Sequence, residues 1–347
     1  MRIHKLALIA ATAGLAASVQ LGRPPAPAPA FHPSALLRDG GLTVRDLPAS
    51  SVSWRGGPVV AATGESVKLF VSNAYTPDVN DVQPWADFVA GLIHGPELAL
   101  LTAYIATPAE VETLCDGVNV LGCYGDDTLV AIGEPVDGVQ PQEVVRHEYG
   151  HHVAANRLNP PWLAVDWGTK RWATQQSVCT RSNAGSAYPG DEGLKYTLNP
   201  GEAFAEAYRV LNDTRAGAAL DWPLVDPSFL PDAVALQAVA DDVSVPWAGP
   251  TASVVHGRFT PSGRRTWTTP LPTPLDGSLT VDLMFPPGTH YAVVLTDGAG
   301  TRVLARGFPS GAVTERLTYL VCGGRTGLLR VTRHGRPGRF ALHITRP

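Results

Sequence analysis

Two histidines four residues apart, His147 and His151, constrain this chain more than any other feature of its sequence. At this spacing the two imidazoles share one face of an α-helix, and their nitrogens can converge on a metal ion. Glu148 lies about 100° around the helix from the first histidine. We therefore predict a metal-binding helix in which His147 and His151 are ligands and Glu148 can take a proton from a metal-bound water.

The residues around this motif favour a helix from about Pro141 to Asn156. Proline suits the first turn, and Glu143 suits the positive end of the helix dipole. The Asn-Pro-Pro run at 159–161 ends the helix. A core helix with two hydrogen-bonded histidines is the alternative interpretation, and a third ligand would separate the two.

The strongest candidate for that ligand lies on a second helix, expected at 200–211 and capped by Asn199. Glu202 and Glu206 are four residues apart and share one face of it. Burying two carboxylates among alanine and phenylalanine is costly without a cation nearby. We predict Glu202 as the third ligand and Glu206 as the carboxylate that holds a ligating histidine. Capping of the helix start by Glu202 is the alternative.

Three other residues bear on the composition of this site. The metzincin pattern needs a histidine six residues after His151, and Arg157 stands there, so that pattern is excluded. Asp166 is a competing ligand whose ordinary role would be a helix cap or turn. His152 falls nearer Glu148 than the metal face, so we expect it behind the ligands or at the surface.

Taken together, the two motifs resemble those of the gluzincin metallopeptidases. HExxH followed about 50 residues later by NPxExFAExxR is similar to the branch of anthrax lethal factor and the proline-specific secreted endopeptidases, over about residues 55–215. The resemblance implies Zn²⁺ held by His147, His151 and Glu202, with Glu148 as general base. It also implies an α+β zincin-like catalytic domain that hydrolyses peptide bonds in a protein or peptide substrate.

In this chain, the tyrosine expected to stabilise the oxyanion of peptide hydrolysis does not stand at the position that the resemblance implies. The same branch carries a tyrosine seven residues before the ligand glutamate, and that position here is Lys195. Tyr196 is one residue away, and we predict it as the hydrogen-bond donor to the developing oxyanion. Tyr188 is the alternative.

The N-terminus predicts a secreted protein. Residues 1–18 combine a basic start with a short apolar stretch, as in a signal peptide, and residues 19–50 form a Pro- and Ala-rich linker or pro-region. The apolar stretch is too short for a comfortable membrane span, and no later stretch reaches that length. We therefore expect no stable membrane span.

Four cysteines in an exported chain favour disulfides. Cys115 and Cys123 bracket a short loop, so we predict that they pair. A bond between Cys179 and Cys322 would tie the two halves of the chain together, but spacing alone does not establish it.

The formal net charge of −4 argues against nucleic acid as the main partner. The charge is uneven, because residues 251–347 contain 12 arginines, no lysine and 4 acidic residues, a formal +8. This Arg-rich part could contact an anionic surface such as a cell-wall polymer. An ordinary solvated surface is the alternative.

The order of elements predicts two domains. Residues 51–250 alternate strands with helices, the strands being expected at 67–73, 98–106 and 128–133 and the helices at 84–93 and 107–115. The strand at 129–132 is expected either as a sheet edge that pairs with an extended peptide or as a plain buried strand. Aromatic residues between 160 and 198 are expected in the cleft wall or the core.

Residues 251–347 change to period-two patterning, which is typical of an all-β sandwich. Strands are expected at 252–259, 278–284, 290–297, 301–306, 315–321, 326–332 and 339–345. This part resembles the bacterial pre-peptidase C-terminal domain of secreted peptidases. The whole chain is thus predicted to be a secreted zinc endopeptidase. The alternative is a non-catalytic zincin-like protein that binds a cell surface or matrix, which the presence of Glu148 disfavours.

Overall fold

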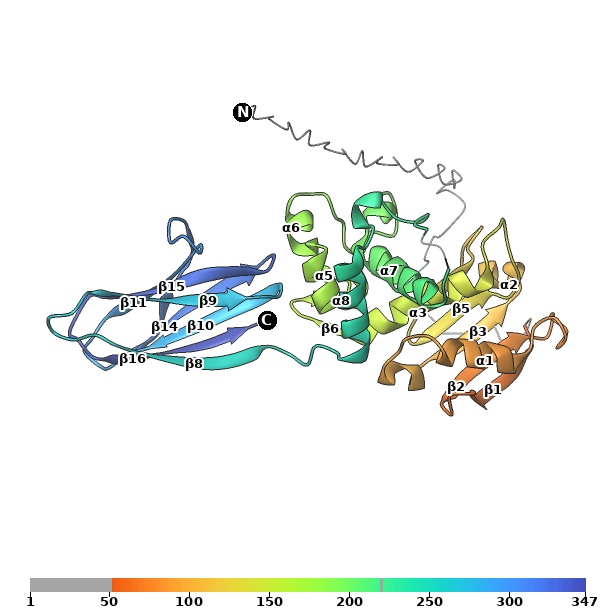
Figure 1. The fold of residues 1–347 in the computed structure, drawn as a ribbon, viewed down its shortest axis with the longest axis horizontal. Coiled ribbons are helices and arrows are strands. Elements are labelled where there is room, and N and C mark those ends of the chain that lie inside the picture. The colour runs from red at the N-terminus through yellow and green to blue at the C-terminus, as the bar shows by residue number, and fades with distance from the viewer. Residues whose placement is uncertain (1–51, 219–220) are drawn as a thin grey trace, which may run out of the picture. The chain divides into compact units, whose positions relative to one another are not determined.

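The computed structural model describes residues 52–218 and 221–347 (Figure 1). The predicted signal peptide at 1–18 and linker at 19–50 lie outside the described residues. Within the described ranges, no helix has the length and apolar character needed to cross a membrane.

The first part of the described chain is built on a five-stranded mixed sheet with the order β1-β2-β3-β5-β4. Its strands are β1 (Trp54–Val60), β2 (Ser66–Ser72), β3 (Thr102–Ala106), β4 (Gly122–Gly125) and β5 (Thr128–Ile132). The three central strands β2, β3 and β5 are parallel, and β1 and β4 pair antiparallel at the two edges. All five residues of β5 are buried, as expected for a central strand covered on both faces.

The structure decides between the two interpretations of the strand at 129–132. β5 is paired on both sides, so it is the plain buried strand, and the edge strand is β4. The sequence of β4, Gly-Cys-Tyr-Gly, carries two glycines and no β-branched residue, so it has little strand propensity. The strand expected from residue 98 begins only at Thr102, because Pro96 opens a short 3₁₀ helix, η1 (Pro96–Ala99).

Helices cover this sheet and carry the functional motifs. The longer ones are α1 (Val82–Ala90), α2 (Pro108–Leu114), α3 (Pro141–Ala155), α7 (Pro200–Arg215) and α8 (Ala233–Ser244). The helix expected at 107–115 is confirmed with its capping box between Thr107 and Glu110. The α3 helix packs on β5 and β4 and runs beside α7 (Figure 1). The sheet therefore supports α3, and α3 in turn supports α7.

Short elements connect α3 to α7 and α7 to α8. They are β6 (Leu158–Asn159), β7 (Trp162–Leu163), α4 (Ala164–Trp167), α5 (Lys170–Gln175), α6 (Val178–Asn183), η2 (Tyr196–Leu198) and η3 (Pro227–Phe229). Trp172 and Phe204 pack edge to face in the core beneath them. Trp162 and Trp167 stack on each other with ring centroids 4.5 Å apart and remain partly exposed.

The second part is a β-sandwich-like region of two antiparallel sheets, ordered β13-β14-β10-β16-β8 and β12-β11-β15-β9. Its strands are β8 (Thr251–Arg258), β9 (Thr266–Thr273), β10 (Gly277–Met284), β11 (Tyr291–Thr296), β12 (Val303–Arg306), β13 (Phe308–Gly311), β14 (Thr314–Val321), β15 (Arg325–Arg333) and β16 (Arg339–Arg346). Alternate residues such as Val281, Val293 and Leu342 form its core. The seven predicted strands are present. Two further strands, β9 and β13, were not predicted. Pro270 and Pro272 interrupt the pattern of β9, which a sheet tolerates at an edge, and β13 is only four residues long.

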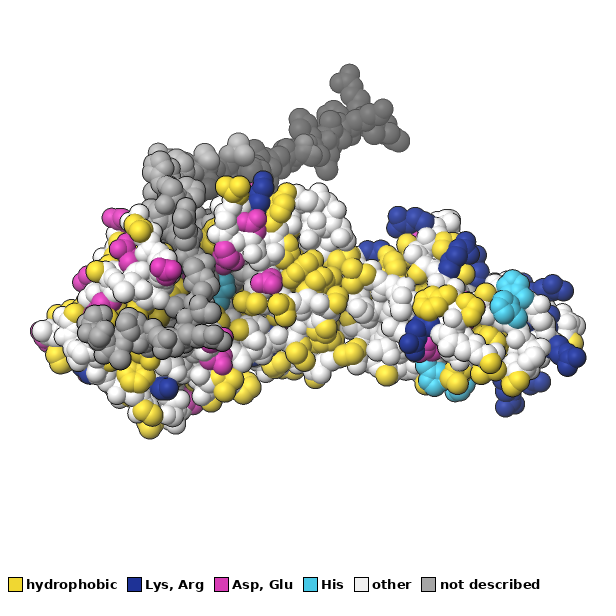
Figure 2. Space-filling view, turned by 180° about the vertical axis from the view of Figure 1, so that it is seen from behind, with side chains coloured by type: hydrophobic (Ala, Val, Ile, Leu, Met, Phe, Trp, Pro, Cys, Tyr) yellow, Lys and Arg dark blue, Asp and Glu magenta, His cyan; other side chains and the backbone are white. Residues whose placement is uncertain are grey.

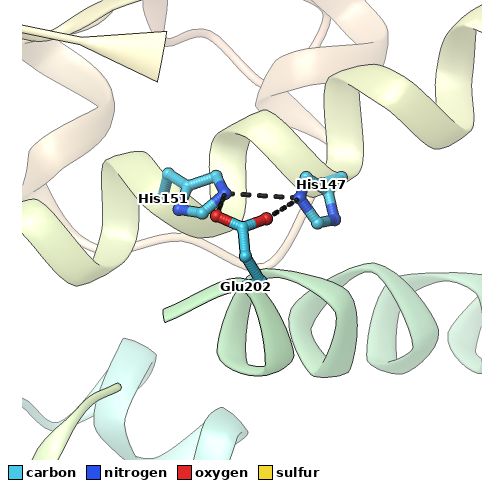
Figure 3. Close-up of side chains that lie close together, drawn as sticks. All are labelled: His147, His151 and Glu202. Atoms are coloured by element: carbon cyan, nitrogen blue, oxygen red, sulfur yellow. Dashed lines mark hydrogen bonds and ion pairs between the residues drawn. The ribbon is translucent and has the colours of Figure 1, made fainter. Parts of the chain in front are cut away.

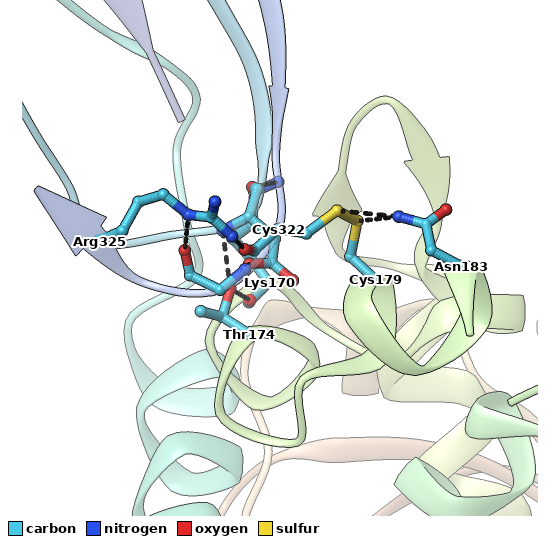
Figure 4. Close-up of a disulfide and its surroundings, with 8 residues drawn as sticks. Lys170, Thr174, Cys179, Asn183, Cys322 and Arg325 are labelled. Carbon is cyan, nitrogen blue, oxygen red and sulfur yellow. Dashed lines mark hydrogen bonds between the residues drawn. A yellow bond between two sulfur atoms is a disulfide. The ribbon is translucent and has the colours of Figure 1, made fainter. Parts of the chain in front are cut away.

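Two disulfides are present in the described residues. The predicted Cys115–Cys123 bond is confirmed, and it ties the end of α2 to β4. The Cys179–Cys322 bond, left open by the sequence, also forms and joins α6 to the end of β14 (Figure 4).

A buried lysine lies near this second bond. Lys170 donates hydrogen bonds to Asn159 Oδ1 at 3.0 Å and to the backbone oxygens of Pro160 and Asp276, both at 2.8 Å. Burial lowers the pKa of Lys170 to about 8. Two independent links, one covalent and one polar, therefore connect the helices at 170–183 to the β-sandwich.

Candidate metal centre

The structure brings together the three residues predicted as metal ligands. His147 and His151 project from α3 and Glu202 projects from α7 toward them, and all three are buried (Figure 3). Nε2 of His147 lies 3.2 Å from Oε2 of Glu202 and 3.3 Å from Nε2 of His151. Nε2 of His151 lies 3.4 Å from Oε1 of Glu202. Glu202 therefore faces the histidines, not the backbone at the start of α7.

These spacings fit a tetrahedral metal ion. Bonds of about 2.0–2.1 Å to nitrogen and oxygen ligands place neighbouring ligand atoms of a tetrahedron about 3.3 Å apart. The three measured spacings, 3.2 to 3.4 Å, are close to that edge length. Two imidazole nitrogens and one carboxylate are also a donor set suited to a divalent transition-metal ion, so the group could hold one.

A glycine within the motif explains how the two helices come so close. A Cβ atom on Gly150 would lie 2.6 Å from the Cα atom and 2.9 Å from the carbonyl oxygen of Ala205. Only a residue without a side chain allows this backbone approach. Gly150 therefore sets the distance between α3 and α7, and through it the distance between the histidines and Glu202.

The electrostatics of the site follow from burial and close charge pairing. Burial opposes a charged imidazole at His147, but hydrogen bonds to Glu202 and Glu206 outweigh it and raise the His147 pKa well above its ordinary value. Burial would raise the pKa of Glu202, but the charges and hydrogen bonds of His151 and His147 lower it. The carboxylates of the site thus favour a positive charge among them, which a proton on His147 supplies here and a metal ion bound to neutral imidazoles would supply instead.

Glu206 contacts His147 on the side of the ring opposite Glu202. Its Oε2 is 3.2 Å from Nδ1 of His147, the ring nitrogen that faces away from Glu202, and its side chain is buried. Burial would raise the pKa of Glu206, but the Arg209 guanidinium and His147 hold it below its ordinary value. A carboxylate at Nδ1 orients the imidazole and leaves Nε2 for a metal.

Glu148 lies between α3 and the edge strand. It is 1% exposed, and a Cβ atom on Gly122 of β4 would lie 2.8 Å from its Oε1 atom. The charge of Glu148 contributes to the raised pKa of its neighbour His147. The Glu148 carboxylate is therefore close to the group of His147, His151 and Glu202 without belonging to it. This is the position expected for a proton acceptor beside the ligands.

Tyr196 and Tyr188 lie in different surroundings. The hydroxyl of Tyr196 donates to Oε2 of Glu202 at 2.5 Å, so its phenol reaches the metal group from η2. The hydroxyl of Tyr188 donates instead to the backbone oxygen of Gly185 in an exposed turn. The side chain of Lys195, the residue just before Tyr196, lies over the Tyr188 ring. Only Tyr196 of the two candidate donors contacts a predicted ligand.

The remaining candidates lie outside the group of three, as far as the described residues show. His152 is buried, and its ring nitrogens contact the hydroxyl of Tyr124 on β4 at 3.1 Å and the backbone oxygen of Glu97 in η1 at 2.8 Å. Asp166 lies beside Gly190, and burial raises its pKa. Sequence reasoning missed Tyr124 and Gly122 because both belong to the unrecognised strand β4.

Comparisons with known proteins add little to this geometry. No protein-family model matches the chain. No curated protein matches it either. Among solved structures, the chain is similar to the pre-peptidase C-terminal domain of collagenase from Bacillus anthracis, with 15% identity over 26% of this chain and 87% of that one. The TM-score is 0.24, so this likeness carries no argument about function.

Proposed function

We propose that this chain is a secreted zinc endopeptidase with a zincin-like catalytic domain of the gluzincin type. The observation that carries the proposal is the buried group of His147, His151 and Glu202, whose spacings match a tetrahedral metal site, with Glu148 beside it. Zinc suits two imidazoles, one carboxylate and a position left open for water. The resemblance of both motifs to gluzincins supports the same assignment.

The chain's own residues supply the proton transfers of peptide hydrolysis. When bound, a zinc ion supplies Lewis-acid polarisation of the substrate carbonyl and acidifies water. Glu148 accepts the proton of the attacking water and returns it to the leaving amine as the carbon–nitrogen bond breaks. Tyr196 donates its hydroxyl hydrogen to the oxyanion that develops at the carbonyl.

The edge strand offers a place for an extended substrate. β4 is the edge strand of the described sheet and pairs there with β5, so its other side is where a further strand could add. An extended peptide could add to that side by backbone hydrogen bonds. Gly122 on this strand lies against Glu148, so a peptide bound there would pass close to the proton acceptor. The two disulfides agree with secretion into an oxidising compartment.

Metal analysis and a peptide-library cleavage profile test the proposal. Purified protein should contain about one zinc ion per chain and cleave peptides, and a chelator should abolish cleavage until zinc is restored. The variant E148A should keep zinc and lose cleavage. Protein that binds no zinc, or that cleaves equally well with E148A, would overturn the proposal.

A second role, contact with an anionic surface, is favoured by one observation in the sandwich. Arg258 and Arg339 stand directly opposite each other on β8 and β16, and both are exposed. Like charges directly opposite are destabilising unless an anion screens them. Figure 2 shows Lys and Arg side chains spread over the β-sandwich. A hollow of about 550 Å³ adjoins the pair, lined by His256, Gly257, Arg258, Trp267, Arg339 and Phe340.

Binding to an immobilised acidic polysaccharide tests this contact. The double variant R258Q/R339Q should elute at lower salt than R302Q/R306Q, which removes the same charge from exposed positions elsewhere in the sandwich. Equal elution of the two variants would contradict a specific contact at the pair. If the unsubstituted chain binds the polysaccharide but cleaves no peptide in any assay, a non-catalytic binding protein would be favoured.

A further inference from the structure

One arginine holds the carboxylate that orients the ligand His147. Arg209 donates from Nε to Oε2 of Glu206 at 3.0 Å and from Nη2 to Oε1 at 2.7 Å. Both carboxylate oxygens of Glu206 therefore accept a hydrogen bond from one planar guanidinium. Oε2 is the same atom that meets Nδ1 of His147 at 3.2 Å.

Arg209 is itself fixed from two further sides. Its Nη1 donates to Oδ2 of Asp213, one turn along α7, and its Nη2 donates to Oδ1 of Asp221. Asp213 also accepts from Arg146 at 2.6 Å. The Arg209 side chain is 5% exposed, so its contacts are shielded from solvent. The guanidinium cannot rotate without breaking several charge-assisted hydrogen bonds at once.

We infer that Arg209 is a positioning residue for the metal centre, acting through Glu206. This inference rests on the proposed zinc site. By holding Glu206 in one orientation, Arg209 keeps a carboxylate oxygen on Nδ1 of His147, which places the ring proton on Nδ1 and leaves the Nε2 lone pair for the metal. The chain of contacts runs from Asp221, which is largely exposed, through Arg209 and Glu206 to His147.

The geometry requires arginine specifically. A lysine at 209 would keep a positive charge near Glu206 but would present a single ammonium group in place of a planar fork. It could contact one carboxylate oxygen well, but it would not fix the carboxylate plane. The variant R209K therefore separates orientation of Glu206 from simple neutralisation of its charge.

The experiment measures zinc affinity by competition with a chromophoric chelator for the full chain and four variants. R209K should bind zinc about 10-fold more weakly, because loss of a residue that orients a ligand typically costs 10- to 100-fold. E206Q should weaken binding by a similar factor. In the double variant E206Q/R209K, the second change should add nothing, because Arg209 acts only through Glu206. R157K is the control, since Arg157 is an equally buried ion-pair partner, of Glu97.

Three results would overturn the inference. They are zinc affinity of R209K within twofold of the unsubstituted chain, an equal loss in R157K, and an R209K effect that persists in full on the E206Q background. A merely structural role would produce the second or third pattern. The visible absorption of the cobalt(II)-loaded protein gives a second readout, because it reports ligand geometry and should change in R209K and E206Q but not in R157K.

D221N keeps the test valid should R209K fail to fold. Asp221 is 58% exposed, so its substitution is well tolerated, and its side chain accepts a hydrogen bond from Arg209. D221N should weaken zinc binding by about threefold, a fraction of the R209K effect; unchanged affinity would count against the inference. Zinc binding without peptide cleavage would reject the proposed function and leave this inference standing. Absence of zinc binding in the unsubstituted chain would reject both.

Discussion

The hydroxyl oxygen of Tyr196 lies 2.5 Å from Oε2 of Glu202. The half-buried phenol of Tyr196 on η2 thus contacts Glu202 of α7, which lies against His147 and His151 of α3. Its donor proton is already directed into the centre, where a peptide oxyanion would develop in the proposed reaction. The position of Tyr196 in the sequence did not establish that it reaches the site, and this contact does.

Replacing this hydroxyl should slow the chemical step. In Y196F the ring remains and the oxyanion loses one donor, so kcat should fall by about 100-fold or more. With zinc in excess, the zinc content should stay the same, because the predicted ligands His147, His151 and Glu202 all remain. Steady-state kinetics on a cleaved peptide, with metal analysis of the same sample, measures both quantities.

Tyr188 provides the matched control for this change. Its hydroxyl donates to the backbone oxygen of Gly185 at 2.8 Å, in the same connection between α6 and α7. Y188F should therefore leave kcat within about twofold of the unsubstituted enzyme. Equal losses in Y188F and Y196F would show that the loop, and not the Tyr196 donor, sustains activity.

Spacing along a helix made the group of His147, His151 and Glu202 predictable. His147 and His151 share a face because of the helical period alone, and the Glu202–Glu206 pair does so for the same reason. Their meeting depends on Gly150, whose role could not be read from sequence because it requires knowing that Ala205 packs against it. Local periodicity thus predicts each half of the site, and the fold decides whether the halves meet.

Gly150→Ala tests whether this close approach matters. The new Cβ atom would lie 2.6 Å from the Cα atom of Ala205, so α3 and α7 must separate. We expect weaker zinc binding and a net loss of about 1–2 kcal/mol in the free energy of unfolding, since overpacking outweighs the helix-propensity gain of alanine. Metal competition and chemical denaturation measure the two effects.

Ala155→Gly is the control for stability on the same helix. Ala155 is exposed at the C-terminal end of α3, so glycine there costs at most about 1 kcal/mol of helix stability without moving α7. Zinc affinity should remain unchanged in A155G. If A155G and G150A weaken zinc binding equally, loss of helix stability explains both, and the spacing argument is wrong.

The edge strand β4 could not be predicted from the sequence, for a different reason. β4 is four residues long with glycine at both ends, so it lacks the apolar alternation by which a strand is recognised. Hydrogen bonds to β5 and the Cys115–Cys123 bond hold it in place instead. In the sandwich, by contrast, long alternating strands such as β10 were predictable because burial alternates with every residue.

Gly122→Ala tests the contact between this edge strand and the proton acceptor. A Cβ atom there would lie 2.8 Å from Oε1 of Glu148 and 2.5 Å from the side chain of Val144. The carboxylate must shift, so kcat should fall by about 10- to 100-fold while zinc affinity changes little. Gly193→Ala is the control, because its nearest new contact is an ordinary 3.6 Å from Asp191. Unchanged kcat in G122A would show that Glu148 tolerates displacement.

His152 predicts how stability depends on pH. The imidazole is buried, and burial lowers its pKa below the ordinary value. Its ring nitrogens contact the hydroxyl of Tyr124 on β4 and the backbone oxygen of Glu97. Because the folded pKa is depressed, the unfolded chain takes up a proton near pH 6.5 while the folded chain does not. The stabilising contribution is therefore complete above about pH 6.5 and is lost as the pH falls toward the folded pKa.

The comparison of the unsubstituted chain with H152Q isolates this contribution. Both proteins are kept metal-free with a chelator, so that protonation of metal-bound histidines does not enter, and the raised pKa of His147 affects both equally. The free energy of unfolding should fall more steeply for the unsubstituted chain than for H152Q between about pH 6.5 and pH 5. Above about pH 7 the difference between the two should be constant, because neutral His152 no longer titrates there. Parallel curves at acid pH would mean that His152 accepts a proton as readily in the folded chain as in the unfolded one, and that its burial does not resist charge.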